Sequence, residues 1–133
     1  EFSQPSTKPQ KIMLDKERMF LAIKNIFDNA VKYTPKGGRI TVSFEIDDQG
    51  LEFKIQDSGI GIPEHQQKKL FRKFFRAVNA IKMEPTGSGL GLFIVKNIIE
   101  EHHGKIWFES KENEGTTFFF RIPIRVLGPL SKP

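Results

Sequence analysis

The sequence predicts an α+β fold, a two-layer sandwich in which about three helices pack on one face of a mixed, largely antiparallel sheet. Two long segments have helical periodicity, and several short segments alternate apolar and polar residues. Turn-type sequences connect most of the alternating segments, which favours antiparallel pairing. The chain has 133 residues, of which 38% are hydrophobic. This composition is enough for one domain with one core.

Composition also limits the classes of function. The absence of cysteine excludes disulfides and thiolate metal sites and suits a reducing compartment. No apolar run approaches the roughly 20 residues that cross a bilayer, so we expect a cytoplasmic domain. The net charge of +5 is moderate, and the Lys and Arg residues are scattered without a recognisable nucleic-acid-binding motif. We therefore expect no nucleic-acid partner.

The first third of the chain predicts an arm, a strand and a helix. Residues 1–10 are polar, contain two prolines and predict a disordered arm or a remnant of cloning. Residues 11–14 are a short strand candidate. Asp15 is a plausible N-cap for a helix that runs to about Tyr33 and stops before Pro35. One broad apolar arc of this helix consists of Met19, Phe20, Ile23, Ile26, Phe27, Ala30 and Val31.

The middle of the chain predicts a hairpin and a second helix. Residues 40–46 alternate apolar and polar side chains, residues 47–50 form a turn, and the returning strand delivers Asp57 at its end. Pro63 begins a short helix that runs to about Phe75. Residues 77–88 show no clear periodicity and predict a flexible loop.

The last third predicts a helix and two more strands. The helix runs from about residue 89 to residue 103 and ends at Gly104 as the C′ residue. The strands span residues 105–110 and 116–124, and a flexible tail follows over residues 125–133.

The first long helix carries unusual polar residues opposite its apolar arc. Asn25 and Asn29 lie one turn apart, close to Lys32 and Tyr33. A solvated helix face prefers better helix formers than Asn. An Asn amide oxygen can coordinate Mg²⁺, Lys32 can neutralise phosphate, and Tyr33 can offer its ring to a base. The alternative is that all four are ordinary surface residues.

Two glycine-rich stretches strengthen the functional interpretation. One spans residues 57–61 and the other residues 87–92, and the second leads directly into a helix. Glycine lets backbone N–H groups approach phosphate oxygens, and a helix N-terminus favours anions. The Asp57 carboxylate could accept a hydrogen bond from the adenine amine, whereas the carbonyl of guanine would be repelled. The alternative for Asp57 is a turn residue flanked by structural glycines.

The order of these motifs resembles the catalytic ATP-binding domain of bacterial sensor histidine kinases. The resemblance covers residues 11–124, so one ATP-binding domain is expected there. It rests on an N box, a first glycine box, an F box and a second glycine box. In order these are Asn25-x-x-x-Asn29-Ala30-x-Lys32-Tyr33-Thr34-Pro35, Asp57-x-Gly59-x-Gly61, Phe71-x-x-Phe74-x-Arg76 and Gly87-x-Gly89-Leu90-Gly91-Leu92.

The resemblance implies a Bergerat-type ATP fold with a lid over residues 77–88. Asn29 would coordinate Mg²⁺, with Asn25 near the metal or the phosphates, and Lys32 and Arg76 would contact phosphates. Asp57 would bind the adenine amine. The other implied nucleotide contacts are Tyr33, Gly59, Gly61, Ile62, Gly87, Ser88, Gly89, Leu90, Gly91, Leu92 and Thr116. Phe71 and Phe74 would anchor the lid and dock a partner domain, or belong to the core.

One position distinguishes the branches of this superfamily. Hydrolytic members of the gyrase and MutL type carry a Glu four residues before the metal-binding Asn, where this chain has Asn25. An amide cannot serve as a general base at neutral pH, so the resemblance favours a histidine kinase domain. Its partners would be a histidine-bearing helical hairpin and, indirectly, a response regulator. The alternatives are a nucleotide-sensing module and a gyrase-type or MutL-type ATPase.

The phosphoacceptor is expected to be absent from this chain. None of its three histidines, His65, His102 and His103, lies in a long helical hairpin. We therefore expect a monomeric domain that is not self-sufficient for autophosphorylation. The resemblance also implies a parent kinase that can be anchored in the inner membrane.

Overall fold

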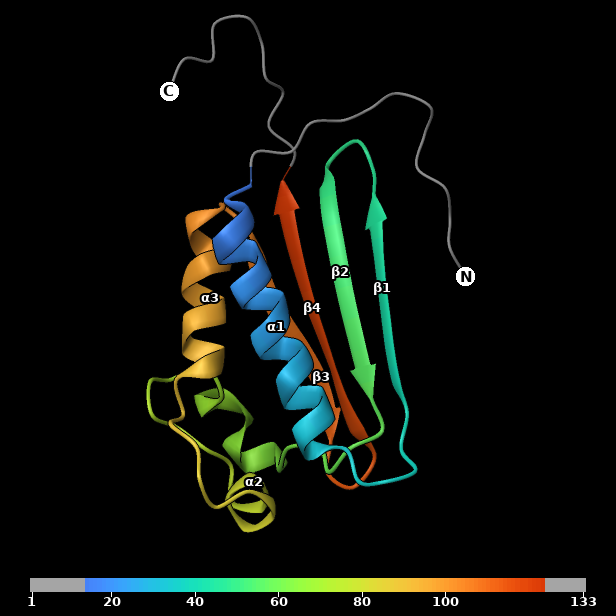
Figure 1. Ribbon diagram of the computed structural model, residues 1–133, viewed down its shortest axis with the longest axis vertical. Helices are drawn as coiled ribbons and strands as arrows, with labels where there is room; N and C mark the ends of the chain where they lie inside the picture. The colour runs from blue at the N-terminus through green and yellow to red at the C-terminus, as the bar shows by residue number, and fades with distance from the viewer. Residues whose placement is uncertain (1–13, 124–133) are drawn as a thin grey trace, which may run out of the picture.

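The computed structural model describes residues 14–123 (Figure 1). The predicted arm, the tail and most of the strand candidate at residues 11–14 lie outside this range. Leu14 is not in a strand and packs against the core. The elements in chain order are α1 (Lys16–Tyr33), β1 (Ile40–Ile46), β2 (Gly50–Asp57), the 3-10 helix η1 (Glu64–Lys69), α2 (Val78–Met83), α3 (Gly91–Glu101), β3 (Lys105–Lys111) and β4 (Gly115–Pro123).

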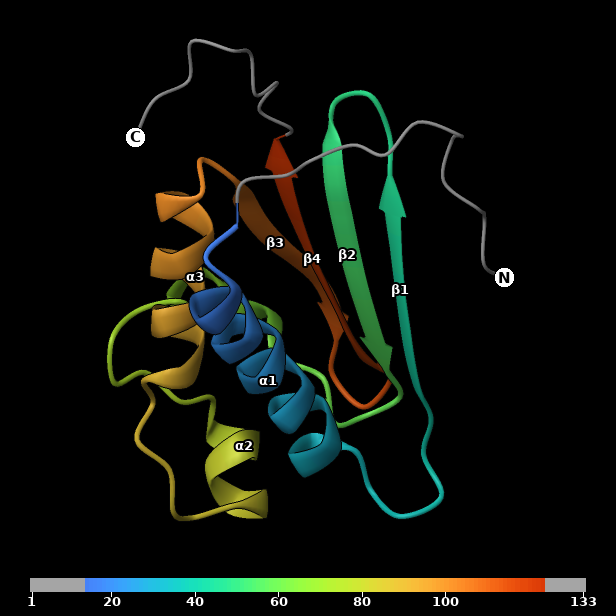
Figure 2. The same cartoon turned by 45° about the horizontal axis from the view of Figure 1, so that its top comes forward.

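The four described strands form one sheet in the order β1-β2-β4-β3, and every neighbouring pair is antiparallel. Helices α1 and α3 lie side by side over one face of this sheet (Figures 1 and 2). The predicted two-layer α+β class is confirmed. The register pairs Asp57 with Thr116, so a carboxylate and a hydroxyl from distant parts of the sequence become neighbours.

The core lies between the sheet and the two long helices. Phe53 of β2 stacks on Phe120 of β4 with ring centroids 4.8 Å apart. Ile26 of α1 and Val95 of α3 are both buried against this layer. Removal of this apolar surface from water is the main stabilising term of such a sandwich. None of the described helices is long and apolar enough to cross a membrane.

The other sheet face carries polar residues and one aromatic pair. Trp107 lies flat against Phe119, with ring centroids 5.3 Å apart and an angle of 4° between the planes. The Lys54 ammonium lies 5.8 Å from the centre of the Phe119 ring. Arg121 pairs with Asp47 at 2.9 Å and with Glu52 at 3.0 Å.

Helix α1 begins as predicted, because the Asp15 side chain accepts a hydrogen bond from the Arg18 N–H. Only part of its apolar arc is buried. The side chains of Phe20, Phe27 and Val31 are 69%, 44% and 52% exposed. The buried stripe is centred instead on Met19, Ala22, Ile26 and Ala30. Periodicity marks an apolar side of a helix but does not tell how much of that side its neighbours cover.

Two other predicted elements differ from the structure. Residues 63–75 are not an α-helix, because η1 ends at Lys69 and turns follow. The Gln67 side chain donates to the carbonyls of Ile62 and Ser110, and these bonds hold the tight 3-10 turn in place. The region predicted as a flexible loop contains the six-residue helix α2.

Helix α3 ends two residues earlier than predicted, at Glu101. The left-handed residue that follows is His103, with φ +62°, and not Gly104. Gly104 is required for another reason, because a Cβ at this position would lie 2.3 Å from the carbonyl oxygen of Arg121. The His102 ring joins the two helices, since its Nε2 accepts the Asp15 N–H at 3.1 Å.

Candidate nucleotide-binding site

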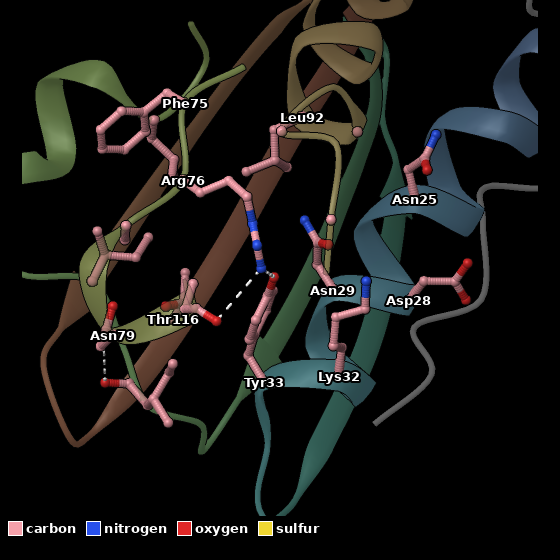
Figure 3. A pocket seen from close by; sticks show the side chains of 18 of the residues that line it. Asn25, Asp28, Asn29, Lys32, Tyr33, Phe75, Arg76, Asn79, Leu92 and Thr116 are labelled. Carbon is pink, nitrogen blue, oxygen red and sulfur yellow. Dashed lines mark hydrogen bonds between the residues drawn. The ribbon is translucent and has the colours of Figure 1, made fainter. Parts of the chain in front are cut away.

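A cavity of about 250 Å³ opens between α1, the loop after β2, the lid segment and the start of α3. Asn29, Asp57 and Gly89, which belong to three separate motifs, all line it. All the predicted site residues except Gly59 and Leu90 are among its lining residues: Asn25, Asn29, Lys32, Tyr33, Asp57, Gly61, Ile62, Arg76, Gly87, Ser88, Gly89, Gly91, Leu92 and Thr116. In Figure 3, Asn29 and Tyr33 of α1 point toward Arg76, while Leu92 of α3 and Thr116 of β4 lie on the other sides of the same space.

The two exceptions shape the loops from within. The Gly59 N–H donates to Asp57 Oδ1 at 2.8 Å, and the Leu90 N–H donates to Ser88 Oγ at 3.1 Å. In this structure both amides are therefore used inside the protein. Their predicted contacts with nucleotide remain predictions.

The Asp57 carboxylate is held in one orientation by the backbone. Oδ1 accepts hydrogen bonds from the N–H groups of Gly59 and Thr116, at 2.8 and 3.1 Å. No described donor bonds to Oδ2. The carboxylate can therefore accept one further hydrogen bond from a donor in the cavity, such as an exocyclic amine.

Burial raises the pKa of the Asp57 carboxyl above its ordinary value of 3.8, and this effect outweighs the two backbone hydrogen bonds. A carboxyl with a raised pKa in the folded protein destabilises that protein wherever it is ionised. We expect the free energy of unfolding of the wild type, relative to an Asp57→Asn variant, to increase as the pH falls from 7 to below 3.8. Denaturant titrations across this range measure the difference.

Asp47 provides a control, because its pKa is shifted in the direction opposite to that of Asp57. Its hydrogen bond to Arg121 lowers the pKa of the Asp47 carboxyl below 3.8. The wild type should therefore lose stability relative to an Asp47→Asn variant as the pH falls below 3.8. A pH dependence of the same sign for the two pairs would contradict the assignment for Asp57.

A hydroxyl network lies beside Asp57. Ser110 Oγ donates to the Gly115 carbonyl at 3.1 Å and accepts the Ile62 N–H at 2.9 Å. Ser110 Oγ also lies 2.8 Å from Thr116 Oγ1, and when Ser110 donates to Gly115 this contact is a donation from Thr116. The buried Thr116 hydroxyl then keeps its lone pairs, which suits it to accept a hydrogen bond from a base or a bridging water.

The polar residues of α1 face the second glycine box. A Cβ added to Gly91 would lie 3.6 Å from Asn25 Oδ1, so this amide stands opposite the start of α3. The first N–H groups of a helix attract phosphate. The described residues contain no cluster of three His, Cys, Asp or Glu side chains that could bind a metal. The predicted coordination of Mg²⁺ by Asn29, with Asn25 near the metal or the phosphates, remains a prediction.

Gly89 has the backbone conformation that its loop requires. Its φ is +70°, and a Cβ would lie 2.6 Å from the backbone carbon of Phe74. The Phe74 N–H donates to the Gly89 carbonyl at 2.9 Å, which joins the F box to the second glycine box. We expect Gly89→Ala to lower the free energy of unfolding by about 1–3 kcal/mol.

Gly91→Ala is the matched control for Gly89→Ala. Its φ is not positive, and its added Cβ would make only the ordinary 3.6 Å contact with Asn25. This variant should change stability by about 0.5 kcal/mol or less. Chemical denaturation of the two variants makes the comparison, and equal losses would refute the close packing of Gly89 on Phe74.

Arg76 spans the cavity wall (Figure 3). Its Nη2 donates to Tyr33 Oη at 3.0 Å and also to the Glu84 carbonyl, while Nη1 donates to the Pro85 carbonyl at 3.3 Å. In this structure the guanidinium therefore holds the end of α2 and the hydroxyl of the N-box tyrosine. Its predicted contact with the γ-phosphate remains a prediction.

Sequence reasoning missed several lining residues. These are Asp28, Ile60, Leu70, Phe75, Ala77, Asn79, Ala80 and Phe118. Phe118 could have been found from the alternation of β4, whose even-numbered side chains face the core. Asn79 had no signal, because it lies in the lid segment that lacks periodicity. Of the two F-box phenylalanines, Phe71 packs edge-on against Phe108 at 5.7 Å, whereas Phe74 is 66% exposed.

Comparisons with known proteins place the chain in a family. Residues 14–126 match the model described as "Histidine kinase-, DNA gyrase B-, and HSP90-like ATPase". The sensor histidine kinase WalK of Bacillus subtilis is 36% identical over 116 residues, which cover 86% of this chain and 19% of WalK. The adaptive-response sensory kinase SasA of Rippkaea orientalis is 40% identical over 114 residues, which cover 85% of this chain and 29% of SasA. The chain thus spans less than a third of either relative.

Solved structures agree. The mycobacterial sensor histidine kinase MprB superposes with a TM-score of 0.77 at 35% identity, over 88% of this chain and 79% of that one. A nucleotide-free form of the catalytic domain of histidine kinase ThkA gives 0.73 at 33% identity, over 90% and 76%. The sandwich is thus the Bergerat fold of histidine kinase catalytic domains. The chain belongs to the family of histidine kinase-, DNA gyrase B- and HSP90-like ATPases, and its relatives in these comparisons are sensor histidine kinases.

Proposed function

We propose that this chain binds Mg²⁺·ATP and donates the γ-phosphoryl group to a histidine on a separate helical-hairpin domain of its parent kinase. One observation carries the proposal: Asn29, Asp57 and Gly89 line the same cavity. A base acceptor, a hard oxygen ligand and a glycine-rich phosphate loop are the parts that an ATP site needs.

Different residues of the chain bind the base, the phosphates and the metal ion. Asp57 and Thr116 bind the base, and the amides of the loop at residues 87–92 bind the phosphates. Asn29, with Asn25 beside it, holds Mg²⁺, which neutralises charge on the phosphate oxygens. Lys32 and Arg76 complete the positive surroundings of the transferring group. These fixed charges and dipoles lower the barrier by stabilising charge in the transition state.

Asn25 in place of a glutamate disfavours hydrolysis of ATP by water. Its amide cannot remove a proton from water at neutral pH. A neutral imidazole nitrogen needs no such removal before it attacks the γ-phosphorus. The new N–P bond forms as the bond from the γ-phosphorus to the bridging oxygen breaks, and ADP leaves. We place this reaction in the cytoplasm, with a response regulator as the later acceptor.

The test combines binding and transfer. Calorimetric titration with ATP, with and without Mg²⁺, should show Mg²⁺-dependent binding to the chain. With γ-labelled ATP, the label should move to a separately supplied hairpin domain of the parent kinase. Binding without transfer would favour a nucleotide-sensing module. Steady hydrolysis without the hairpin would favour a gyrase-type or MutL-type ATPase, and absence of ATP binding would end the proposal.

A further inference from the structure

The lid is attached to the base-binding loop by one side chain. Asn79, in the second position of α2, donates from Nδ2 to the Gly61 carbonyl at 2.8 Å (Figure 3). The same nitrogen lies 3.4 Å from the Ile60 carbonyl oxygen. Within residues 14–123, no other side chain of the lid makes a hydrogen bond to this loop. Asn79 therefore links two segments that both line the cavity.

The contacts of the Asn79 carboxamide also fix its orientation. Turning the amide over would place its oxygen against two carbonyl oxygens. In the observed orientation Oδ1 is buried and has no partner among the described residues. Such an unpaired acceptor is destabilising, and an apolar side chain of the same size would fill the space without that cost. The hydrogen bond from Nδ2 to the Gly61 carbonyl, and not packing, therefore explains why residue 79 is polar.

The loop that Asn79 holds is also bonded to the turn between β3 and β4. The Ile60 carbonyl also accepts the Asn113 N–H at 2.7 Å. Gly61 has φ +66°, and a Cβ there would lie 2.1 Å from the carbonyl oxygen of Lys111. The hydrogen bond joins the loop to the turn between β3 and β4, and the missing Cβ of Gly61 lets the loop lie close to the end of β3. Since the loop begins at Asp57, Asn79 gives the lid a fixed point next to the base acceptor.

The other anchors of the lid lie elsewhere. The Val78 N–H donates to Gln66 Oε1 at 2.9 Å, on the exposed side of η1. Arg76 holds the far end of α2 and reaches Tyr33 on α1. Neither side chain bonds directly to the loop that carries Asp57, although the Tyr33 carbonyl accepts the Ile60 N–H at 3.1 Å. Among the described residues, Asn79 is therefore the direct side-chain link between the lid and this loop.

We propose that Asn79 is a positioning residue of the nucleotide site, which ties the lid to the loop that binds the base so that occupation of the base pocket orders the lid. This rests on the proposed function. A base bound in the pocket contacts Gly61 and its neighbours and reduces their motion. Because Asn79 is hydrogen-bonded to Gly61, the motion of α2 is reduced as well. The lid should then respond to ADP, which has the base but lacks the γ-phosphate.

The experiment compares the wild type with Asn79→Leu, which keeps the approximate volume but cannot donate to Gly61. In the wild type, ADP should slow amide hydrogen exchange over residues 78–86. In Asn79→Leu this protection should be lost and the affinity for ADP should fall about 3- to 10-fold, the effect of one or two neutral hydrogen bonds. Asn79→Gln, which keeps the donor on a longer side chain, should recover part of both effects.

Thr86→Val is the control for this experiment, and Asn79→Ala is a second variant at the same position. Thr86→Val removes a lid hydroxyl that bonds only to Glu84 Oε1 at 2.9 Å, and it should leave both the protection and the affinity unchanged. Asn79→Ala should reproduce the result of Asn79→Leu if the leucine variant does not fold. If the wild type binds ADP and both Asn79 variants keep full affinity and lid protection, the inference is overturned. If the wild type binds neither ADP nor ATP, the proposed function fails instead.

Discussion

Asp57→Asn should weaken ATP binding by about 10- to 100-fold, the effect of losing a hydrogen bond to a charged acceptor and leaving a buried donor unpaired. The substitution keeps the shape of the side chain. An asparagine oxygen can still accept the N–H groups of Gly59 and Thr116, so the loop keeps its geometry. The other branch, however, becomes an NH₂ group that faces the adenine amine with a donor. Isothermal titration with ATP measures the loss.

Asp47→Asn is the matched control for this experiment. It makes the same chemical change in an exposed carboxylate that pairs with Arg121 outside the cavity. Its ATP affinity should equal that of the wild type. In addition, GTP should bind Asp57→Asn better relative to ATP than it binds the wild type, because the new NH₂ group can donate to the guanine carbonyl. Unchanged ATP affinity in Asp57→Asn would remove adenine recognition from this residue.

Asn29→Ala should abolish the Mg²⁺ dependence of ATP binding and lower phosphoryl transfer by about 100-fold. Asn29 lies on the side of α1 that lines the cavity, where its amide oxygen can act as a neutral hard ligand. Titrations with ATP at increasing Mg²⁺ concentration measure the first effect. Transfer of label to the hairpin domain measures the second.

Asn97→Ala controls for the loss of an asparagine from a helix. Asn97 is exposed on α3 and is not among the residues that line the cavity. This variant should keep both the Mg²⁺ response and the transfer rate. A normal Mg²⁺ response in Asn29→Ala would show that the metal is held by other groups.

The meeting of most predicted site residues at one cavity was largely predictable, because it follows from local backbone features. The Gly89 loop and the end of β2 at Asp57 are both local consequences of the sequence. The spacing of Asn25 and Asn29 on one helix places them on one side by geometry alone. What the sequence could not predict is that β2 pairs with β4, which brings Thr116 next to Asp57.

The failures share one physical origin, because they concern contacts between elements. Helix α2 has only six residues, too few for a periodic pattern, and its ends are held by Arg76 and Asn79. Phe20 and Phe27 are exposed because no neighbouring element covers them, which the periodicity of the helix cannot tell. Neither the presence of α2 nor the exposure of these two side chains can be recognised from the local sequence pattern.

Trp107, the single tryptophan of the chain, lies against Phe119 on the sheet face that is turned away from the cavity. The fluorescence of its indole therefore reports the packing of β3 against β4. The sheet separates this indole from the cavity, so nucleotide in the cavity would not contact it. Melting curves followed by this fluorophore can be compared across nucleotide concentrations on one common baseline. Any spectral change on adding nucleotide would report deformation of the platform itself.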